Sequence, residues 1–177
     1  MNEIVIIGTI AADTAVNIIK DNKEELRKTL SERFIKESLD KLTTINENNR
    51  DFINGLECDF CLEITEFGIN GSLWDYAVDR KCGIEVELMD IPIEQETIEI
   101  CEVFDVNPYV SYSKNVFIVS VKSSYEVLKK SRQAGIIAAA VGIETDSKDR
   151  VIVNKDEKKY LTPTNRADYF SERYKHE

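Results

Sequence analysis

Short apolar segments alternate with amphipathic segments along most of this chain, and this alternation restricts the possible fold more than any single residue does. Ile4–Ile7 is an unbroken apolar run of strand length. Asp59–Ile64 and Ile84–Leu88 alternate apolar and polar residues, which is typical of half-buried strands. Phe34–Ile45 instead repeats its apolar residues at helical spacing. Because both periods occur, the sequence predicts an α+β domain with a mixed sheet.

The remaining elements follow from the same patterns and from turn residues. Strands are expected at 109–112, 116–121, 136–143 and 151–153. Helices are expected after an N-cap at Asp13, at 70–81, at 94–104 and from Ser123 or Ser124 to Gln133. The segments 109–112 and 116–121 are expected to pair as a hairpin. A chain of 177 residues is expected to form one domain, here residues 1–161, followed by a polar tail at 162–177 in which Tyr169, Phe170 and Tyr174 could pack against the domain.

The net charge of −10 is concentrated in one part of the chain. Residues 57–105 hold 14 acidic residues and two basic ones, a balance of −12, whereas the rest holds 21 basic and 19 acidic residues, a balance of +2. Binding to nucleic acid or to an anionic membrane surface requires a basic face. The sequence therefore predicts neither kind of partner.

No segment of the sequence is typical of membrane insertion or export. No apolar run approaches the ~18–20 residues that cross a bilayer. The first eight residues lack the basic start of a signal peptide. We therefore expect a cytoplasmic protein whose thiols stay reduced.

The four cysteines and one histidine offer little for metal or nucleophilic chemistry. Cys58 and Cys61 form a C-x-x-C, but the alternation around them predicts a strand, in which residues three apart point to opposite faces. Cys82 and Cys101 are expected to be buried as small apolar residues. The only histidine is His176, so a Cys–His or Ser–His pair is not expected. We predict no catalytic residue and no metal ligand.

The order of motifs in Cys61–Ile93 (CLEITEFGINGSLWDYAVDRKCGIEVELMDIPI) resembles the C-terminal domain of the PurM-like, AIR synthase-related superfamily. In that family a strand leads into Asp-x-Thr-x-Gly-Gly-Leu at the start of a helix, followed by a short strand and an Ile-Pro pair. Residues 4–19 are similar to the family's first strand and helix, and residues 98–128 are most similar to its hydrogenase-maturation members, HypE. The resemblance covers residues 3–161 and implies a three-layer α/β/α domain, a mixed sheet flanked by helices.

The resemblance also implies candidate residues for a substrate or phosphate loop. They occupy the family's first loop and the strand-to-helix turn, and they are Thr9, Glu63, Thr65, Gly68 and Asn70. Phe67 stands where the family has the first glycine of its pair. Glycines there let backbone N–H groups approach a phosphate at a helix N-terminus, and a phenylalanine is expected to crowd that approach. We therefore favour a turn retained for folding.

Other family features are not found in the sequence. Members carry a preceding domain whose Lys and Asp residues bind ATP and magnesium, and this chain has no glycine-rich lysine loop. We expect no cofactor in this chain, and ATP and Mg²⁺ only where a separate nucleotide-binding domain is recruited. HypE-like proteins end in Pro-Arg-Ile-Cys, whereas this chain ends in 171–177 without a cysteine, so HypE chemistry is not expected.

Three functions remain open. The first is a stand-alone domain of this family acting as a non-catalytic binding or protein-interaction module. The second is the substrate-side subunit of a split ATP-dependent synthase or kinase, with its nucleotide domain on another chain. The third is a small-molecule binder that kept the pocket and lost the chemistry. Expected partners are a second copy in a homodimer or a separate PurM-like N-terminal-domain protein.

Overall fold

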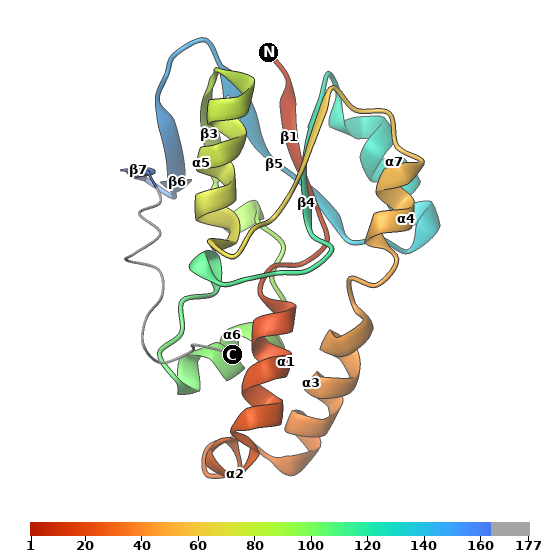
Figure 1. The fold of residues 1–177 in the computed structure, drawn as a ribbon, viewed down its shortest axis with the longest axis vertical. Helices are drawn as coiled ribbons and strands as arrows, with labels where there is room; N and C mark the ends of the chain where they lie inside the picture. The colour runs from red at the N-terminus through yellow and green to blue at the C-terminus, as the bar shows by residue number, and fades with distance from the viewer. Residues whose placement is uncertain (164–177) are drawn as a thin grey trace.

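The computed structural model describes residues 1–163, through which one seven-stranded sheet runs (Figure 1). The strands are β1 (Glu3–Ile7), β2 (Phe60–Glu63), β3 (Gly83–Glu87), β4 (Phe117–Val121), β5 (Ala138–Thr145), β6 (Arg150–Asn154) and β7 (Glu157–Tyr160). Their order across the sheet is β2-β4-β1-β5-β3-β6-β7. Neighbouring strands are antiparallel except β3 and β6, which are parallel. The expected mixed sheet is confirmed.

Helices occur between most of these strands. They are α1 (Ala12–Asp21), α2 (Lys23–Leu26), α3 (Glu32–Thr44), α4 (Asn49–Asn54), α5 (Gly68–Arg80), α6 (Gln95–Val103) and α7 (Ser124–Ala134), with short 3₁₀ turns η1 (Leu88–Asp90) and η2 (Pro108–Val110). The short helices α2 and α4 lie in polar segments whose composition did not predict them. No helix within residues 1–163 is long and apolar enough to cross a membrane.

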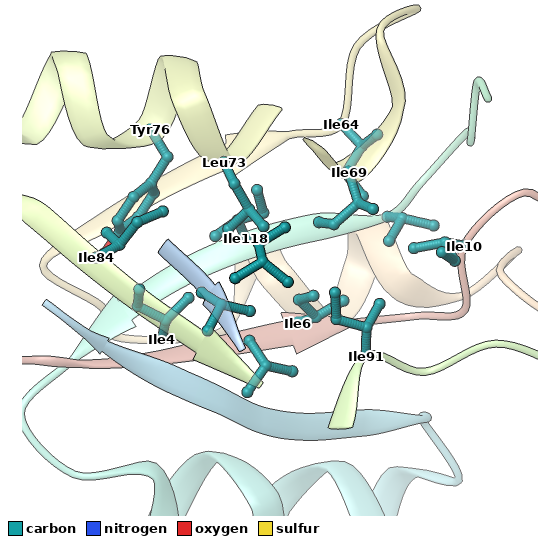
Figure 2. Close-up of a cluster of buried hydrophobic side chains, with 14 of the residues drawn as sticks. Ile4, Ile6, Ile10, Ile64, Ile69, Leu73, Tyr76, Ile84, Ile91 and Ile118 are labelled. Atoms are coloured by element: carbon teal, nitrogen blue, oxygen red, sulfur yellow. The ribbon is translucent and has the colours of Figure 1, made fainter. Parts of the chain in front are cut away.

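The helices form layers on both faces of the sheet (Figure 1). On one face, Leu73 and Tyr76 of α5 pack against Ile4 and Ile6 of β1 (Figure 2). On the other face, side chains of α4 and α7 pack against a cluster that contains Val5 and Ile7 of the same strand. All four apolar residues of β1 are fully buried, which explains its unbroken apolar run. The arrangement is the expected α/β/α sandwich.

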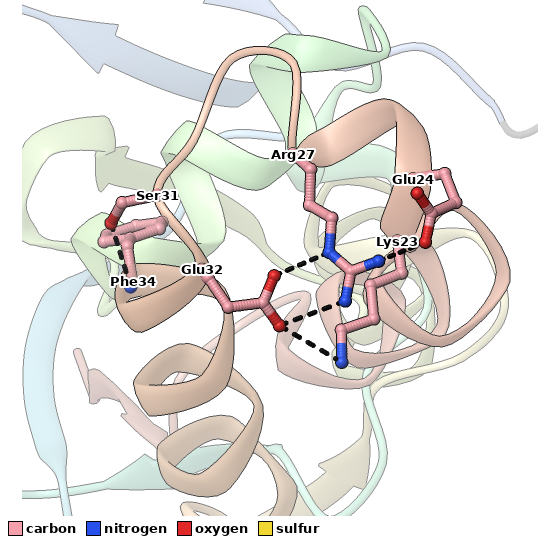
Figure 3. Close-up of polar contacts among 6 residues, drawn as sticks. All are labelled: Lys23, Glu24, Arg27, Ser31, Glu32 and Phe34. Atoms are coloured by element: carbon pink, nitrogen blue, oxygen red, sulfur yellow. Dashed lines mark hydrogen bonds and ion pairs between the residues drawn. The ribbon is translucent and has the colours of Figure 1, made fainter.

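A group of helices extends beyond one end of the sheet, where α1, α3 and α6 share a separate apolar cluster (Figure 1). Ser31 begins α3 by accepting a hydrogen bond from the Phe34 N–H at 3.1 Å. Arg27 joins α2 to α3 through ion pairs with Glu24 and Glu32 (Figure 3). These pairs are exposed to solvent, which screens them, so they add little to stability.

The start of α1 differs from the prediction. Ala11, not Asp13, is the N-cap residue, and it has a left-handed conformation without a side-chain cap. Its N–H donates to the Ser113 hydroxyl at 2.6 Å, while Asp13 accepts the Lys114 N–H at 2.7 Å. The first turn of α1 is therefore held by the 113–114 loop, a long-range contact that local sequence could not reveal.

The hairpin predicted over 109–121 is wrong. Residues 108–110 form the turn η2, in which Asn107 accepts the Tyr109 N–H at 3.0 Å and Pro108 occupies the first position. Proline with an Asn cap favours such a helical start. The strand at 117–121 is correct, but β4 pairs with β1 and β2.

The C-terminal part of the described chain adds a hairpin that the sequence did not suggest. β5 and β6 form where expected, but β3 lies between them in the sheet. β7 is fully exposed and polar, so no apolar alternation marked it. It pairs with β6, and the Leu161 N–H then donates to the Arg150 carbonyl at 2.8 Å. Tyr169, Phe170 and Tyr174 lie outside the described residues.

Candidate functional site

The turn between β2 and α5, where the family's loop is expected, is closed by its own hydrogen bonds. The Thr65 N–H donates to Ser72 Oγ at 3.0 Å, and the two hydroxyls lie 3.3 Å apart. Thr65 Oγ1 also accepts the Phe67 N–H at 3.4 Å. The polar groups of Thr65 therefore hold the first turn of α5. Phe67 is 5% exposed, so its ring lies inside the protein.

Gly68 has a structural reason to be glycine. Its φ is +70°, a conformation that side chains other than glycine rarely adopt. A Cβ there would lie 2.5 Å from the carbonyl carbon of Val110 and 2.6 Å from the nitrogen of Ser111. The glycine thus lets α5 approach the backbone of η2, which supports the interpretation of this turn as one retained for folding.

Glu63 and Thr9 belong to a second polar region, a network of asparagines that follows the end of β1. Asn46 accepts the Thr9 N–H at 3.0 Å and donates to the Thr9 carbonyl at 2.9 Å. Asn49 donates to Asn46 Oδ1 at 3.1 Å and to the Asn115 carbonyl at 2.9 Å. The Asn115 N–H in turn donates to Glu63 at 3.1 Å. The network joins two candidates that are distant from each other in the sequence.

Both candidates in this network are occupied by structural contacts. Thr9 is fully buried, and its hydroxyl donates to the Pro92 carbonyl at 3.3 Å. Glu63 also forms an ion pair with Arg50 at 2.7 Å. Asn46 and Asn49 were missed because a polar run reads as an exposed loop, whereas both are buried here. Their position behind Gly8, whose Cβ would meet Asn49 at 2.5 Å, could be found only in three dimensions.

Asn70, another predicted candidate, lines a pocket. The pocket has a volume of about 280 Å³. It lies between the start of α5, the turns η1 and η2, and the β6–β7 hairpin, and it is lined by Asn70, Leu88, Asn107, Tyr109, Ile152, Asn154, Glu157, Lys159, Tyr160, Leu161 and Thr162. Asn70 Oδ1 is buried and has no hydrogen-bond partner among the described residues. Burial raises the pKa of Tyr109, so its phenol stays neutral.

The other end of α5 contacts a buried carboxylate of β5, that of Glu144. Glu144 accepts hydrogen bonds from Tyr76 at 2.6 Å, Arg80 at 2.8 Å and Ser120 at 2.8 Å. Burial alone would raise its pKa, but the hydrogen bonds from Arg80, Tyr76 and Ser120 lower the pKa of Glu144 to about 2. It is therefore a fixed anion at neutral pH. We name Glu144, Tyr76, Arg80 and Ser120 the Glu144 cluster.

The cysteines do not form a reactive site. Cys58 and Cys61 pack against the same apolar cluster, so the prediction that they point to opposite faces is wrong. Cys58 precedes the first residue of β2, Phe60, and strand alternation does not apply to it. Burial raises the pKa of Cys61 to about 11 and that of Cys101 to about 12, so both stay protonated. All four thiols are free.

The acidic segment 57–105 is partly neutralised by bases from outside it. Glu63 pairs with Arg50, Glu85 with Lys158, and Glu94 and Glu96 with Lys41. These acids are distributed over β2, β3 and the start of α6. Within residues 1–163, no group of three or more His, Cys, Asp or Glu side chains is placed to hold a metal ion.

A mixed sheet covered by helices on both faces, with a glycine-dependent turn ahead of its main helix, is the α+β architecture of PurM-like C-terminal domains. Residues 3–154 match the family model described as AIR synthase related protein, C-terminal domain, and the chain belongs to this family. No curated protein sequence matches it.

Solved structures show the same fold at low sequence identity. E. coli HypE, a hydrogenase maturation protein, superposes with a TM-score of 0.68 at 15% identity over 93% of this chain and 50% of HypE. Thiamine-monophosphate kinase from Stenotrophomonas maltophilia gives 0.58 at 12% identity, over 88% of this chain and 50% of the kinase. T. maritima PurL complexed with ATP gives 0.56 at 16%, over 92% of this chain and 24% of PurL. The chain thus spans half or less of these proteins.

Proposed function

We propose that this AIR synthase-related C-terminal domain is a non-catalytic binding module that takes a small molecule in the pocket beside Asn70. One observation carries the proposal. The polar groups of Thr65 and Glu63 hold the fold together, whereas the pocket contains the buried Asn70 Oδ1, which has no hydrogen-bond partner among the described residues. Its volume of about 280 Å³ is close to the lower end of small-molecule pockets, ~300–1,000 Å³.

The proposal gives the chain no phosphoryl-transfer activity of its own. Such transfer requires cationic groups and metal ions around the phosphate. The pocket is lined by one lysine and one glutamate, and its other polar side chains are uncharged. ATP and Mg²⁺ would enter only with a separate nucleotide-binding domain.

Two measurements on the purified chain test this function. We expect no phosphate release from Mg-ATP above a blank carried through the same purification. We also expect that a small molecule bound in this pocket raises the unfolding temperature of the protein. A ligand at 100 times its Kd stabilises the folded state by about 2.7 kcal/mol. Hydrolysis that persists through purification and is lost in the variant Asn70→Ala would overturn the non-catalytic role.

A second candidate is the substrate-side part of a two-chain ATP-dependent enzyme. It is favoured by the structural neighbours, because they include a HypE and a PurL that were solved in complex with ATP. The partner would then be a PurM-like N-terminal-domain protein. Co-expression followed by gel filtration distinguishes the two: a 1:1 complex that hydrolyses ATP supports the second candidate, and a lone chain or a homodimer supports the first.

A further inference from the structure

The pairing of β6 with β7 places four of the pocket's lining residues on one face of the hairpin. Ile152 is opposite Lys159, and Asn154 is opposite Glu157. Opposite residues share a face, and residues two apart along a strand do so as well. These four side chains therefore lie on one face, the side on which Ile152 joins the core cluster of α5.

The neighbouring residue Lys158 faces the other way. It is opposite Val153, and its Nζ lies 3.1 Å from a carboxylate oxygen of Glu85 on β3. Glu85 is opposite Val151, which belongs to the same alternate set as Val153. β7 thus presents one lysine away from the pocket and one lysine toward it.

The pocket face of β7 carries one negative and one positive group. Glu157 and Lys159 are two positions apart, which places their Cα atoms roughly 6.6 Å from each other in a strand. Both are exposed, and neither forms an ion pair with another described residue. They are therefore available to a ligand that carries both charges.

Around these charges the lining is apolar or neutral. Leu88, Ile152 and Leu161 provide hydrocarbon surface, and carboxamides come from Asn70, Asn107 and Asn154. Asn107 already accepts the Tyr109 N–H with its oxygen, so its amide is partly used. A ligand for this pocket would combine two opposite charges with a small apolar or neutral portion.

We propose that the pocket binds a small zwitterion, an α-amino acid or a compound with the same adjacent ammonium and carboxylate groups. This rests on the proposed binding function and names its ligand class. Lys159 binds the carboxylate and Glu157 binds the ammonium. The apolar lining contacts the ligand side chain.

Asn70 explains why the site gains from a polar ligand. Its Oδ1 is buried without a partner among the described residues, which is unfavourable because a buried acceptor loses its bonds to water. The terminal amide torsion of asparagine is soft, so the amide can turn to meet a ligand N–H. A bound ammonium or amide would supply that donor.

The same charges argue against a phosphate ligand. A phosphate carries up to two negative charges, and here it would meet a single lysine with a carboxylate about two strand residues away. The lining has no excess positive charge, since its one basic and one acidic side chain cancel. A zwitterion matches this balance, whereas a phosphate does not.

The test is a binding screen on the full chain. The twenty common amino acids, inorganic phosphate and ATP are each assayed by thermal shift, and every hit is measured by calorimetry. For the amino acid that binds, its C-terminal amide and the matching carboxylic acid without the amine are measured as well. We expect each deletion of a charge to weaken binding by up to about fivefold, as for a partly exposed ion pair.

Matched variants locate the site. Glu157→Gln and Lys159→Gln should each weaken amino-acid binding by about fivefold, and Asn70→Ala by a similar factor. Lys158→Gln, on the opposite face of the same strand, should leave the affinity unchanged. All four variants should unfold as cooperatively as the original chain.

The outcomes separate this inference from the proposed function. Binding of an amino acid that responds to Glu157 and Lys159 but not to Lys158 supports both. If no amino acid binds, or if the affinity is the same in the Glu157 and Lys159 variants as in the original chain, the proposed zwitterionic ligand is wrong. In that case a neutral or phosphorylated ligand whose affinity falls in Asn70→Ala leaves the proposed function standing. ATP hydrolysis by a chain that binds no ligand at this pocket would contradict both the zwitterion inference and the proposed function.

Discussion

The two ends of α5 carry polar groups in opposite situations. At its C-terminal end, Tyr76 and Arg80 bind the buried carboxylate of Glu144, and every member of the Glu144 cluster has a partner. At its N-terminal end, Asn70 lines a pocket and its buried oxygen has no partner within residues 1–163. One helix therefore stabilises the fold at one end, and at the other end it holds a hydrogen-bond acceptor that has no partner among the described residues. Residues at the two ends should respond differently to substitution.

The largest effect is expected from removing the carboxylate. Glu144→Ala leaves the Tyr76 and Ser120 hydroxyls and the Arg80 charge without their partner, and breaking such a buried pair costs about 3–5 kcal/mol. Urea unfolding measures the loss. Glu85→Ala, which removes an exposed pair with Lys158, is the control and should cost under about 1 kcal/mol. Equal losses in the two variants would contradict the role of the Glu144 cluster.

Acid should weaken the same end of the helix. The pKa of Glu144 is lowered from 4.5 to about 2 in the folded protein, so the stability it provides is complete above pH 4.5 and is lost as the pH falls toward 2. The loss should reach about 3 kcal/mol, since one pKa unit corresponds to about 1.4 kcal/mol. The variant Glu144→Gln should show a shallower decline over this range. A decline as steep as that of the original chain would assign the acid sensitivity to other groups.

Gly68, at the opposite end of α5, tests how closely the turn is packed. Gly68→Ala should cost about 2–3 kcal/mol, because it combines a positive φ with contact to the backbone of Val110 and Ser111. Gly135→Ala has a similar φ of +69° but nothing within 4 Å of the added Cβ. It should cost only about 1 kcal/mol, and thermal denaturation of both variants isolates the contribution of the close approach. No difference between them would mean that η2 moves away easily.

The smallest effect is expected at Asn70. Asn70→Ala removes an oxygen without a partner, so the free energy of unfolding should change by less than about 0.5 kcal/mol. Asn46→Ala, which breaks two buried hydrogen bonds to Thr9, should cost about 1–3 kcal/mol. Chemical denaturation without added ligand compares the two. A large loss in Asn70→Ala would show that this residue serves the fold.

Most strands and long helices could be predicted because their apolar spacing reports burial directly. Ile4–Ile7 and the helix around Phe34–Ile45 are examples in which local pattern and final structure agree. The hairpin at 109–121 failed because Asn107-Pro108 favours a 3₁₀ turn over the weak strand pattern that follows. β7 was not predicted because all four of its residues are exposed, so it has no apolar alternation. It is recognisable as a strand through its pairing with β6.

The candidate site was harder to predict than the fold. The family's motif located the turn at Thr65 and Gly68 and the start of the pocket at Asn70, but not what each side chain does. Thr65 and Gly68 serve packing through contacts with Ser72 and with η2, and such contacts depend on distant segments. The pocket residues of β6 and β7 carried no signal, because a solvent-exposed Glu or Lys is common on any strand.

The position of β1 in the sheet has a consequence for biosynthesis. This strand ends at Ile7, yet its two neighbours begin at Phe117 and Ala138. At about 5–20 residues per second, the ribosome needs roughly 5–20 s to supply the first of them. Until β4 and β5 have been made, both edges of this apolar strand lack their hydrogen-bonding partners. Pairing across such a sequence separation is also slow. The strand should therefore depend on chaperones that shield it during synthesis, and the centre of the sheet can form only after β4 and β5 have been made.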